Sequence, residues 1–592
     1  MINFEVRYTV RFLMKSIRLH TIIPIFFFLF VTTESKQLSY TNPVISGSYP
    51  DPSICRVGDD YYIVNSSFEY FPGLPIHHSR DLVNWTLIGY GLHRESQCNG
   101  KMNLVDVQSD GGIHAPSIRY HNGTFYIITT NVYSPGTGEK TEMINFIITS
   151  DNIEGPWSEP HIIEGAPGID PDIIFDDDGT VWYVGTHSPS KPNFNGEGEI
   201  WLQQLDLKTW SLTGERYFLW RGALFYGTWA EGPHIYKRNG YYYLVIAEGG
   251  TGLNHAVMIS VSDNITGPYV PNDRNPILTS RHLSNDYWVN SVGHGDLVQT
   301  KNGTWYMVAL GIRSELETFS SMGRETHLIP VTWEQEKFPW KYSKIDKQWV
   351  SLPNKQRFEK LRLVNYEWPV CSPLTGRVEK QYPLPIRGRP QSKNYRFKDS
   401  FNKKKLNLEW NFRRVPQKGT YNINPKNGYL RLYSSKNVIK NRKSCSLMGI
   451  RQKETNFIFL AKMRFNPNMY GIDAGVSLFQ KDDNYLTFTV EYSEGKYFLK
   501  LILKEKDLAP NIVQRTPIKS YNGLITFKIV SENNSYDIYY TLGNKKSFTL
   551  FKTIGPDKLL SKGYTGGYLG VYCTSNGKEA REYADFDKVE YY

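Results

Sequence analysis

The sequence predicts an all-β protein, a five-bladed β-propeller followed by a β-sandwich. Three observations lead to this prediction. A hairpin turn followed by an aromatic-rich strand occurs five times, residues 397–592 continue as short alternating strands without that repeat, and 14% of the residues are aromatic. Tyr, Trp and Phe favour strands, and Tyr and Trp rings also suit stacking on sugars. At 592 residues the chain is too long for a single hydrophobic core, so we expect several domains.

Residues 1–35 are typical of a secretory signal peptide. Basic residues precede an apolar stretch at 22–31, which is about half as long as the roughly 20 residues that a membrane span needs. We therefore expect an exported protein, secreted or periplasmic, with no membrane segment in its mature form. The net charge of +11 is spread along the chain, and the sequence contains no nucleic-acid-binding motif.

The cysteines are widely scattered and show neither a CxxC motif nor the spacing of zinc ligands. The sequence allows one or two disulfides after export, and the odd number leaves at least one thiol free. The five residues are Cys55, Cys98, Cys371, Cys445 and Cys573.

The five repeats predict the blades of a propeller over residues 36–345. Asn-Gly and Asp-Gly turns between alternating apolar runs are strong hairpin signals, and a period of roughly 60 residues suits a four-stranded blade. An aromatic residue marks an outer strand after each turn. The second turn residues are Asp60, Gly123, Gly179, Gly240 and Gly303, and the outer-strand markers are Trp85, Trp157, Trp210, Tyr269 and Trp333.

A polar residue precedes each of these turns by nine positions. The five are Asp51, His114, Asp170, Glu231 and His294. Since the first strand of every blade lines the central channel, equivalent positions should converge on the axis. A single Asp before Pro is more often a turn or cap residue. Five polar residues at one repeat position favour a functional site over structural roles.

Three carboxylates around one pocket suit glycoside hydrolysis, which needs one protonated and one ionised carboxyl group. Glu231 has the longer reach and follows the apolar Trp229-Ala230, so we predict that it is the general acid. Asp51 is the predicted general base. Asp170 would orient the acid and raise its pKa, because a neighbouring negative charge disfavours ionisation.

A metal site is the competing use of Asp, Glu and His residues. A hard cation gathers several oxygen ligands close together, whereas these histidines belong to different blades. The sequence therefore predicts no metal ligands and no cofactor. It is compatible with a structural Ca²⁺ near His294 but does not require one.

Several motifs follow one another at residues 49–53, 66–73, 111–116, 168–171, 231–234, 293–295 and 323–326. Together and in this order they resemble glycoside hydrolase family 43, in its β-xylosidase and α-L-arabinofuranosidase branch. The resemblance implies a five-bladed propeller, hydrolysis with inversion, and the roles given above for the three carboxylates. It also implies that Arg324 and His294 lie in the pocket beside the sugar and the modulating carboxylate, and that Phe68 forms an aromatic wall of the glycone subsite.

His114 departs from the family pattern, because many members carry Trp or another aromatic residue at this position. The imidazole could hydrogen-bond a sugar hydroxyl, or it could be bonded to the backbone behind the sugar. The departure leaves the choice between xylose and arabinose open.

After the propeller we expect a Pro-rich linker at 346–394 and a β-sandwich accessory domain at 395–592. Residues 400–412 resemble the C-terminal, concanavalin-like domain of many xylosidases of this family. That architecture implies that a sandwich loop narrows the active-site mouth. Gly563–Gly567 is the best match, with Tyr564 facing the pocket; a buried tyrosine at a strand edge is the alternative.

The predicted function is that of an exo-acting, inverting glycosidase. It would release xylose or arabinose from the non-reducing ends of xylo-oligosaccharides or from arabinosyl side chains. The alternatives are an endo-arabinanase, against which the sandwich domain counts, and a non-catalytic carbohydrate-binding propeller, against which the three carboxylates count. The expected partner is an oligosaccharide, and a homo-oligomer is compatible with the sequence.

Overall fold

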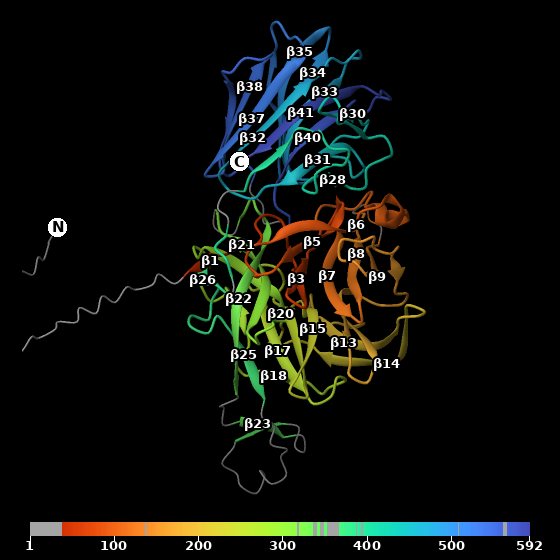
Figure 1. The fold of residues 1–592 in the computed structure, drawn as a ribbon, viewed down its shortest axis with the longest axis vertical. Helices are drawn as coiled ribbons and strands as arrows, with labels where there is room; N and C mark the ends of the chain where they lie inside the picture. The colour runs from red at the N-terminus through yellow and green to blue at the C-terminus, as the bar shows by residue number, and fades with distance from the viewer. Residues whose placement is uncertain are drawn as a thin grey trace, which may run out of the picture. The chain divides into compact units, whose positions relative to one another are not determined.

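The computed structural model describes residues 38–592 except 136–137, 139, 316–318, 336–339, 344–347, 352–365, 386–387, 392–394, 507 and 560–564. The described residues from Ser39 onward belong to one compact unit (Figure 1). The predicted signal peptide lies outside the described residues. Among those that the structure describes, no helix is long and apolar enough to cross a membrane.

Five antiparallel sheets form the propeller, and each starts with the predicted inner strand. Blade 1 contains β2 (Ser53–Val57), β3 (Asp60–Val64), β5 (Gly73–Ser79) and β6 (Thr86–Leu92). Blade 2 contains β7 (Gly112–His121), β8 (Thr124–Tyr133), β9 (Glu142–Ser150) and β10 (His161–Ile162). Blade 3 contains β11 (Ile169–Phe175), β12 (Val181–His187), β13 (Glu199–Asp206) and β14 (Ser211–Trp220).

Blades 4 and 5 follow the same plan. Blade 4 contains β15 (Glu231–Arg238), β16 (Tyr241–Glu248), β17 (Ala256–Ser262) and β18 (Val270–Pro271), and β19 (Leu278–Thr279) also pairs with β17. Blade 5 contains β20 (Val289–Gln299), β21 (Trp305–Arg313), β22 (Arg324–Gln335) and β25 (Glu367–Cys371). Two short 3-10 helices, η1 (Glu95–Cys98) and η2 (Gly100–Asn103), connect blades 1 and 2. The predicted five-bladed fold is confirmed.

Part of the segment expected to be a linker belongs to the propeller. The outer strand of blade 5 is β25, in which Pro369 pairs with Trp333 of β22. Farther on, β26 (Gln381–Pro383) pairs with β1 (Ser39–Thr41). The prolines that suggested a linker are compatible with strands here because β25 and β26 are edge strands, where a missing N–H costs little. A separate hairpin is formed by β23 (Trp340–Ser343) and β24 (Gln348–Ser351).

Two eight-stranded sheets build the predicted β-sandwich around one apolar core. One sheet contains β27 (Phe397–Asp399), β29 (Tyr421–Asn424), β30 (Tyr429–Tyr433), β32 (Phe457–Arg464), β37 (Leu524–Glu532), β38 (Ser535–Leu542), β39 (Thr549–Ile554) and β41 (Tyr583–Tyr591). The other contains β28 (Asn411–Arg413), β31 (Ser446–Arg451), β33 (Ile472–Lys481), β34 (Asn484–Ser493), β35 (Lys496–Glu505), β36 (Asn511–Pro517), β40 (Tyr568–Thr574) and β4 (Tyr70–Phe71).

The strand β4 joins the two domains, because it lies between β3 and β5 in the chain yet pairs with β28 of the sandwich. Phe412 is opposite Phe71, and Arg413 is opposite Tyr70. The Tyr70 ring also stacks on Tyr568, with ring centroids 3.8 Å apart. A strand from blade 1 therefore completes a sandwich sheet, and the two domains share a hydrogen-bonded edge.

All five cysteines are buried free thiols, so the disulfides that the sequence allowed are not formed.

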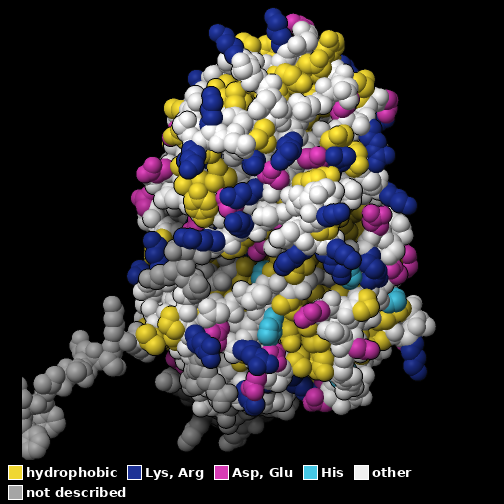
Figure 2. All heavy atoms as spheres, turned by 45° about the horizontal axis from the view of Figure 1, so that its top comes forward, with side chains coloured by type: hydrophobic (Ala, Val, Ile, Leu, Met, Phe, Trp, Pro, Cys, Tyr) yellow, Lys and Arg dark blue, Asp and Glu magenta, His cyan; other side chains and the backbone are white. Residues whose placement is uncertain are grey.

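Figure 2 shows Lys and Arg side chains spread among Asp and Glu over the visible face, which agrees with a net charge that is not concentrated in one segment.

Candidate active site

The inner strands of the blades are irregular where the predicted polar residues lie. In blades 2 to 5 the pairing of the first strand shifts beside His114, Asp170, Glu231 and His294. Asp170 and His294 have positive φ angles of 54° and 45°, and Asp51, just before β2, has a φ of 48°. A bulge turns a side chain out of the regular alternation, and here it occurs at the residues of the predicted site.

Asp51 is held on both carboxylate oxygens. The Ser66 hydroxyl donates to Oδ2 at 2.6 Å, and Arg324 Nη1 donates to Oδ1 at 2.8 Å. Only 4% of Asp51 is exposed, and this burial alone would raise its pKa. The Arg324 guanidinium, His294 and the Ser66 hydroxyl more than offset the burial and hold the pKa below its ordinary value. Asp51 is therefore ionised at neutral pH.

Asp170 has the opposite environment. It is 6% exposed and accepts one hydrogen bond from the backbone N–H of Gly232, at 3.1 Å from Oδ2. Burial and the negative charge of Asp51 raise the pKa of Asp170 to about 7. The Gly232 N–H and Arg324 act against this rise without cancelling it.

Glu231 opens β15 and is partly exposed. Burial of its carboxyl group, followed by the charges of Asp170 and Asp51, raises its pKa well above the ordinary value, and Arg324 only partly opposes this. The site thus combines a carboxylate that stays ionised with a carboxylic acid that keeps its proton. This division is what general acid and base catalysis at one centre requires.

Arg324 connects several predicted residues. It is the first residue of β22 and is 4% exposed. Besides Asp51 it contacts the Thr251 hydroxyl, at 3.3 Å from Nη1, and its guanidinium lies 5.5 Å from the ring centroid of Phe68. Phe68 is 1% exposed, so most of its ring packs against neighbouring side chains.

His294 lies beside Asp51, with Nδ1 3.9 Å from Oδ1. Burial lowers the pKa of His294 to about 4, so the ring is neutral at neutral pH although Asp51 favours its charged form. The ring also lies against Gly232, which has a φ of +57°, and a Cβ at that position would come within 3.0 Å of it. Only glycine leaves room for this histidine next to the acid.

His114 uses its Nδ1–H to donate to the Gly112 carbonyl at 2.9 Å, and its ring meets Phe68 edge-on with centroids 4.9 Å apart. Burial lowers the pKa of His114, so the ring is neutral and Nε2 can accept a hydrogen bond. The backbone contact orients the ring, and Nε2 is the atom through which His114 could accept a hydrogen bond from a ligand.

Tyr564 lies outside the described residues, but the next residues of that loop contact the propeller beside Arg324. Thr565 forms a β-bridge with Gly323, and its hydroxyl donates to Asp110 at 2.8 Å. Backbones approach closely here, since a Cβ on Gly323 would lie 2.4 Å from Gly566 N.

Sequence reasoning missed the residues that hold this arrangement in place. Ser66 lies inside one of the family motifs, which could have drawn attention to it, whereas Thr251 carries no such signal. Two sandwich residues reach the segment before Asp51: Arg451 Nε donates to Ser48 O at 2.9 Å, and Lys453 Nζ donates to the Tyr49 hydroxyl at 3.1 Å.

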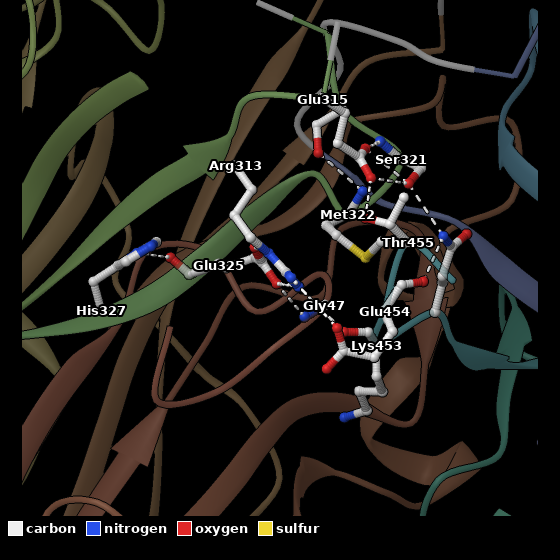
Figure 3. A network of polar contacts seen from close by, with 12 residues as sticks. Gly47, Arg313, Glu315, Ser321, Met322, Glu325, His327, Lys453, Glu454 and Thr455 are labelled. Atoms are coloured by element: carbon white, nitrogen blue, oxygen red, sulfur yellow. Dashed lines mark hydrogen bonds and ion pairs between the residues drawn. The ribbon is translucent and has the colours of Figure 1, made fainter. Parts of the chain in front are cut away.

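A network between the domains fixes the strand of Arg324 (Figure 3). The neighbouring Glu325 is fully buried and pairs with Arg313, whose Nη2 donates to Oε1 at 2.8 Å, and Gly47 N donates to the same oxygen at 2.8 Å. Arg313 also donates to Lys453 O of the sandwich at 3.2 Å. Thr455 contacts Glu315 at 2.5 Å.

Deeper along the inner strands lies a second polar cluster. Arg119 bridges the carboxylates of Asp172 and Asp296, which also raises the pKa of the guanidinium. Asp296 accepts from the Ser53 hydroxyl at 2.7 Å, and His234 contacts Asp172 at 2.8 Å. These bonds tie the inner strands of all five blades together, including the strands that carry Asp170 and Glu231. Within the described residues, no group of three or more His, Cys, Asp or Glu side chains is placed to hold a metal ion.

The profile of Glycosyl hydrolases family 43 matches residues 40–339, and that of the beta-xylosidase C-terminal concanavalin A-like domain matches residues 398–592. A xylosidase/arabinosidase of Butyrivibrio fibrisolvens is 37% identical over 92% of this chain and 98% of its own. A non-reducing end α-L-arabinofuranosidase of Bacteroides ovatus is 33% identical over 94% of this chain and 95% of its own.

The fold is also shared with solved structures. The structure of a xylan β-1,4-xylosidase from Bacillus halodurans has a TM-score of 0.79 at 28% identity, covering 93% of this chain and 99% of that one. The resemblance inferred from the motifs is therefore confirmed over both domains.

Proposed function

The chain belongs to glycosyl hydrolase family 43, and we propose that it is an exo-acting, inverting glycosidase that releases single pentoses from hemicellulose fragments. One observation carries the chemistry. Asp51 is kept ionised by Arg324, while the carboxyl group of Glu231 is kept protonated by burial and by the charges of Asp170 and Asp51. These are the two protonation states that an acid and base pair needs across a glycosidic bond.

In the proposed mechanism Asp51 takes a proton from a water molecule as the water oxygen bonds to the anomeric carbon. Glu231 gives its proton to the leaving oxygen as the bond between that oxygen and the anomeric carbon breaks. Attack from the face opposite the leaving group inverts the anomeric configuration. Asp170 orients the site through Gly232 N and keeps Glu231 protonated until the transfer.

The sugar is proposed to be xylose or arabinose, since relatives that cover most of the chain are named for one or both. Exo action is supported by the sandwich residue Thr565, whose backbone pairs with Gly323 directly before Arg324. We also propose that the protein acts outside the cytoplasm or in the periplasm on oligosaccharides. Nucleic acid and membranes are not among its proposed partners, and it needs no resident cofactor.

Two measurements test this function. Incubation with 4-nitrophenyl β-D-xyloside and 4-nitrophenyl α-L-arabinofuranoside should release nitrophenol from at least one, and proton NMR should show the inverted anomer first. Net retention would contradict the mechanism. Binding of xylo-oligosaccharides without hydrolysis of either glycoside would favour the non-catalytic propeller, and cleavage of internal arabinan bonds would favour the endo-arabinanase.

A further inference from the structure

A group of exposed aromatic side chains lies on loops next to the acid Glu231 and is not used by the chemistry above. Phe225 is 88% exposed, Tyr226 is 65% exposed and Trp229 is 46% exposed, although all three are large rings. They lie in the connection between β14 and β15. Phe194, from the connection between β12 and β13, meets Tyr226 edge-on with centroids 5.3 Å apart. Phe225 in turn meets Tyr226, with ring centroids 4.4 Å apart, and contiguous exposed apolar surface of this kind marks a binding site more often than a solvent face.

The loop that carries these rings is anchored on a buried carboxylate. Glu248, at the end of β16, is fully buried, and its Oε2 accepts the backbone N–H of Ala223 at 2.6 Å. Gly222 and Gly227 lie against that carboxylate, where a Cβ would come within 2.3 Å and 2.7 Å of it. The loop is therefore wrapped around Glu248, which leaves Phe225 and Tyr226 at its exposed tip.

Trp229 links this surface to the catalytic centre. It precedes Glu231 by two residues, has a positive φ of 55°, and its N–H donates to Gly196 O at 2.6 Å. Its ring packs on Gly250, where a Cβ would lie 2.7 Å from Cδ1. The next residue, Thr251, contacts Arg324 and thereby the base Asp51. The chain segment that carries the exposed rings thus leads directly to Glu231.

The position of the acid decides which part of a substrate would meet these rings. A general acid lies beside the oxygen of the leaving group, so the chain that departs extends past Glu231. Sugar rings present C–H faces to aromatic rings and hydroxyl groups to water, which suits a surface of exposed Trp, Tyr and Phe rings. We infer that Phe194, Phe225, Tyr226 and Trp229 form a platform that binds the leaving-group side of the substrate, a β-1,4-linked xylosyl chain. This inference rests on the proposed function.

The platform predicts a dependence on chain length. Wild-type kcat/KM should be higher for xylotetraose than for xylobiose, and Phe225→Ala/Tyr226→Ala should lower kcat/KM for xylotetraose roughly threefold to tenfold. The same variant should leave β-D-xylosyl fluoride unchanged, since its leaving group is too small to reach the loop. If the wild type releases arabinose instead, arabinosylated xylotetraose and 4-nitrophenyl α-L-arabinofuranoside replace these substrates.

Met469→Ala/Tyr470→Ala is the matched control, because these adjacent residues are 44% and 54% exposed and belong to the sandwich. It should leave every rate unchanged. The platform would be overturned if the loop variant kept the wild-type ratio of kcat/KM for xylotetraose to kcat/KM for xylobiose. It would also be overturned if kcat/KM for β-D-xylosyl fluoride fell as much as kcat/KM for xylotetraose. A wild type that hydrolyses no pentoside would overturn the proposed function itself, before any variant is compared.

Discussion

At the scale of single residues, the protonation of the carboxyl groups follows from their different neighbours. Asp51 has a guanidinium and a hydroxyl on its oxygens, whereas Asp170 has a single backbone N–H and the charge of Asp51 nearby. Glu231 has burial and two negative neighbours. Arg324 donates a hydrogen bond to Asp51 and is the main group that lowers its pKa, whereas it does not cancel the rise at Asp170 or Glu231. In water the three carboxyl groups would have similar pKa values.

Glu231→Gln tests the role of the acid. The variant should lose roughly 10²–10⁴-fold in kcat on xylobiose, whose leaving group needs a proton, and much less on 4-nitrophenyl β-D-xyloside. Steady-state kinetics on both substrates measure the difference. An equal loss on both would show that Glu231 is not the acid.

Asp170→Asn tests how the acid keeps its proton. Removing a negative charge beside Glu231 should lower the pKa of Glu231, so the basic limb of the kcat/KM profile should move to lower pH. The shift should be partial, because burial is the larger cause and remains in the variant. The acid limb depends on Asp51 and should stay below the ordinary carboxyl range in the wild type. A basic limb that does not move would contradict the coupling.

At the scale of elements, the strand that begins at Arg324 is fixed by buried charges at the domain interface. Arg313→Met should leave Glu325 buried, with the Gly47 N–H as its one remaining hydrogen-bond partner among the described residues, which should cost about 3–5 kcal/mol of unfolding free energy. The catalytic rate should fall too, because Glu325 directly follows Arg324, which holds Asp51. Denaturant unfolding and kcat on a nitrophenyl glycoside measure both effects.

Arg80→Ala is the control for this prediction, since Arg80 pairs with Asp60 but its side chain is 73% exposed. Surface pairs contribute little, and the control should change neither measurement. If the two variants were equally stable, the buried pair would not be what holds β22.

Glu69, directly before β4, is a second buried acidic residue at the same interface. It is fully buried, neither of its carboxylate oxygens has a hydrogen-bond partner among the described residues, and burial raises its pKa from 4.5 to about 7. Below pH 4.5 it is protonated in both states, so it does not alter the stability there. Between these pKa values only the unfolded chain ionises, so stability falls as the pH rises.

Glu69→Gln removes this titration. Between pH 4.5 and pH 8 the free energy of unfolding of the variant should rise by about 3 kcal/mol relative to that of the wild type. Burial of the amide shifts the stability of the variant by the same amount at every pH, so it does not affect this change. Thermal unfolding midpoints of both proteins across this range provide the measurement. A difference that is independent of pH would mean that Glu69 is already ionised in the folded protein, paired with Arg413.

At the scale of the whole molecule, the sandwich supports the catalytic propeller. Arg451 is fully buried, donates to Ser48 O, and lies over the Tyr49 ring at 4.4 Å from its centroid. This segment leads directly to Asp51. Since β4 is also shared between the domains, neither should unfold without disturbing the other.

Calorimetry should therefore show a single unfolding transition for the full chain, and Arg451→Met should lower both its midpoint and kcat. The reason is that methionine cannot donate the two hydrogen bonds that the buried guanidinium makes to Ser48 O and Asn411 Oδ1, so both oxygens lose these donors. Two resolved transitions, or a variant with normal kcat, would show that the sandwich does not position Asp51.

The sequence by itself determined the blade repeat and the convergence of Asp51, Asp170 and Glu231. Both depend on local periodicity, because the nine-residue register from turn to inner strand is maintained within each blade. Prolines misled the same reasoning at 346–394, where Pro369 lies in an edge strand of blade 5. Local pattern does not reveal whether a segment will find an open sheet edge.

Only the tertiary structure decided how the three carboxyl groups differ. The pKa of Asp51 depends on Arg324, which is far away in the chain, and the position of Arg324 depends in turn on Glu325, Arg313 and the sandwich. Charges act through space, and burial is a property of the packed chain. The sequence could therefore point to the three candidate carboxyl groups, while their protonation states and the aromatic surface beside Glu231 required the fold.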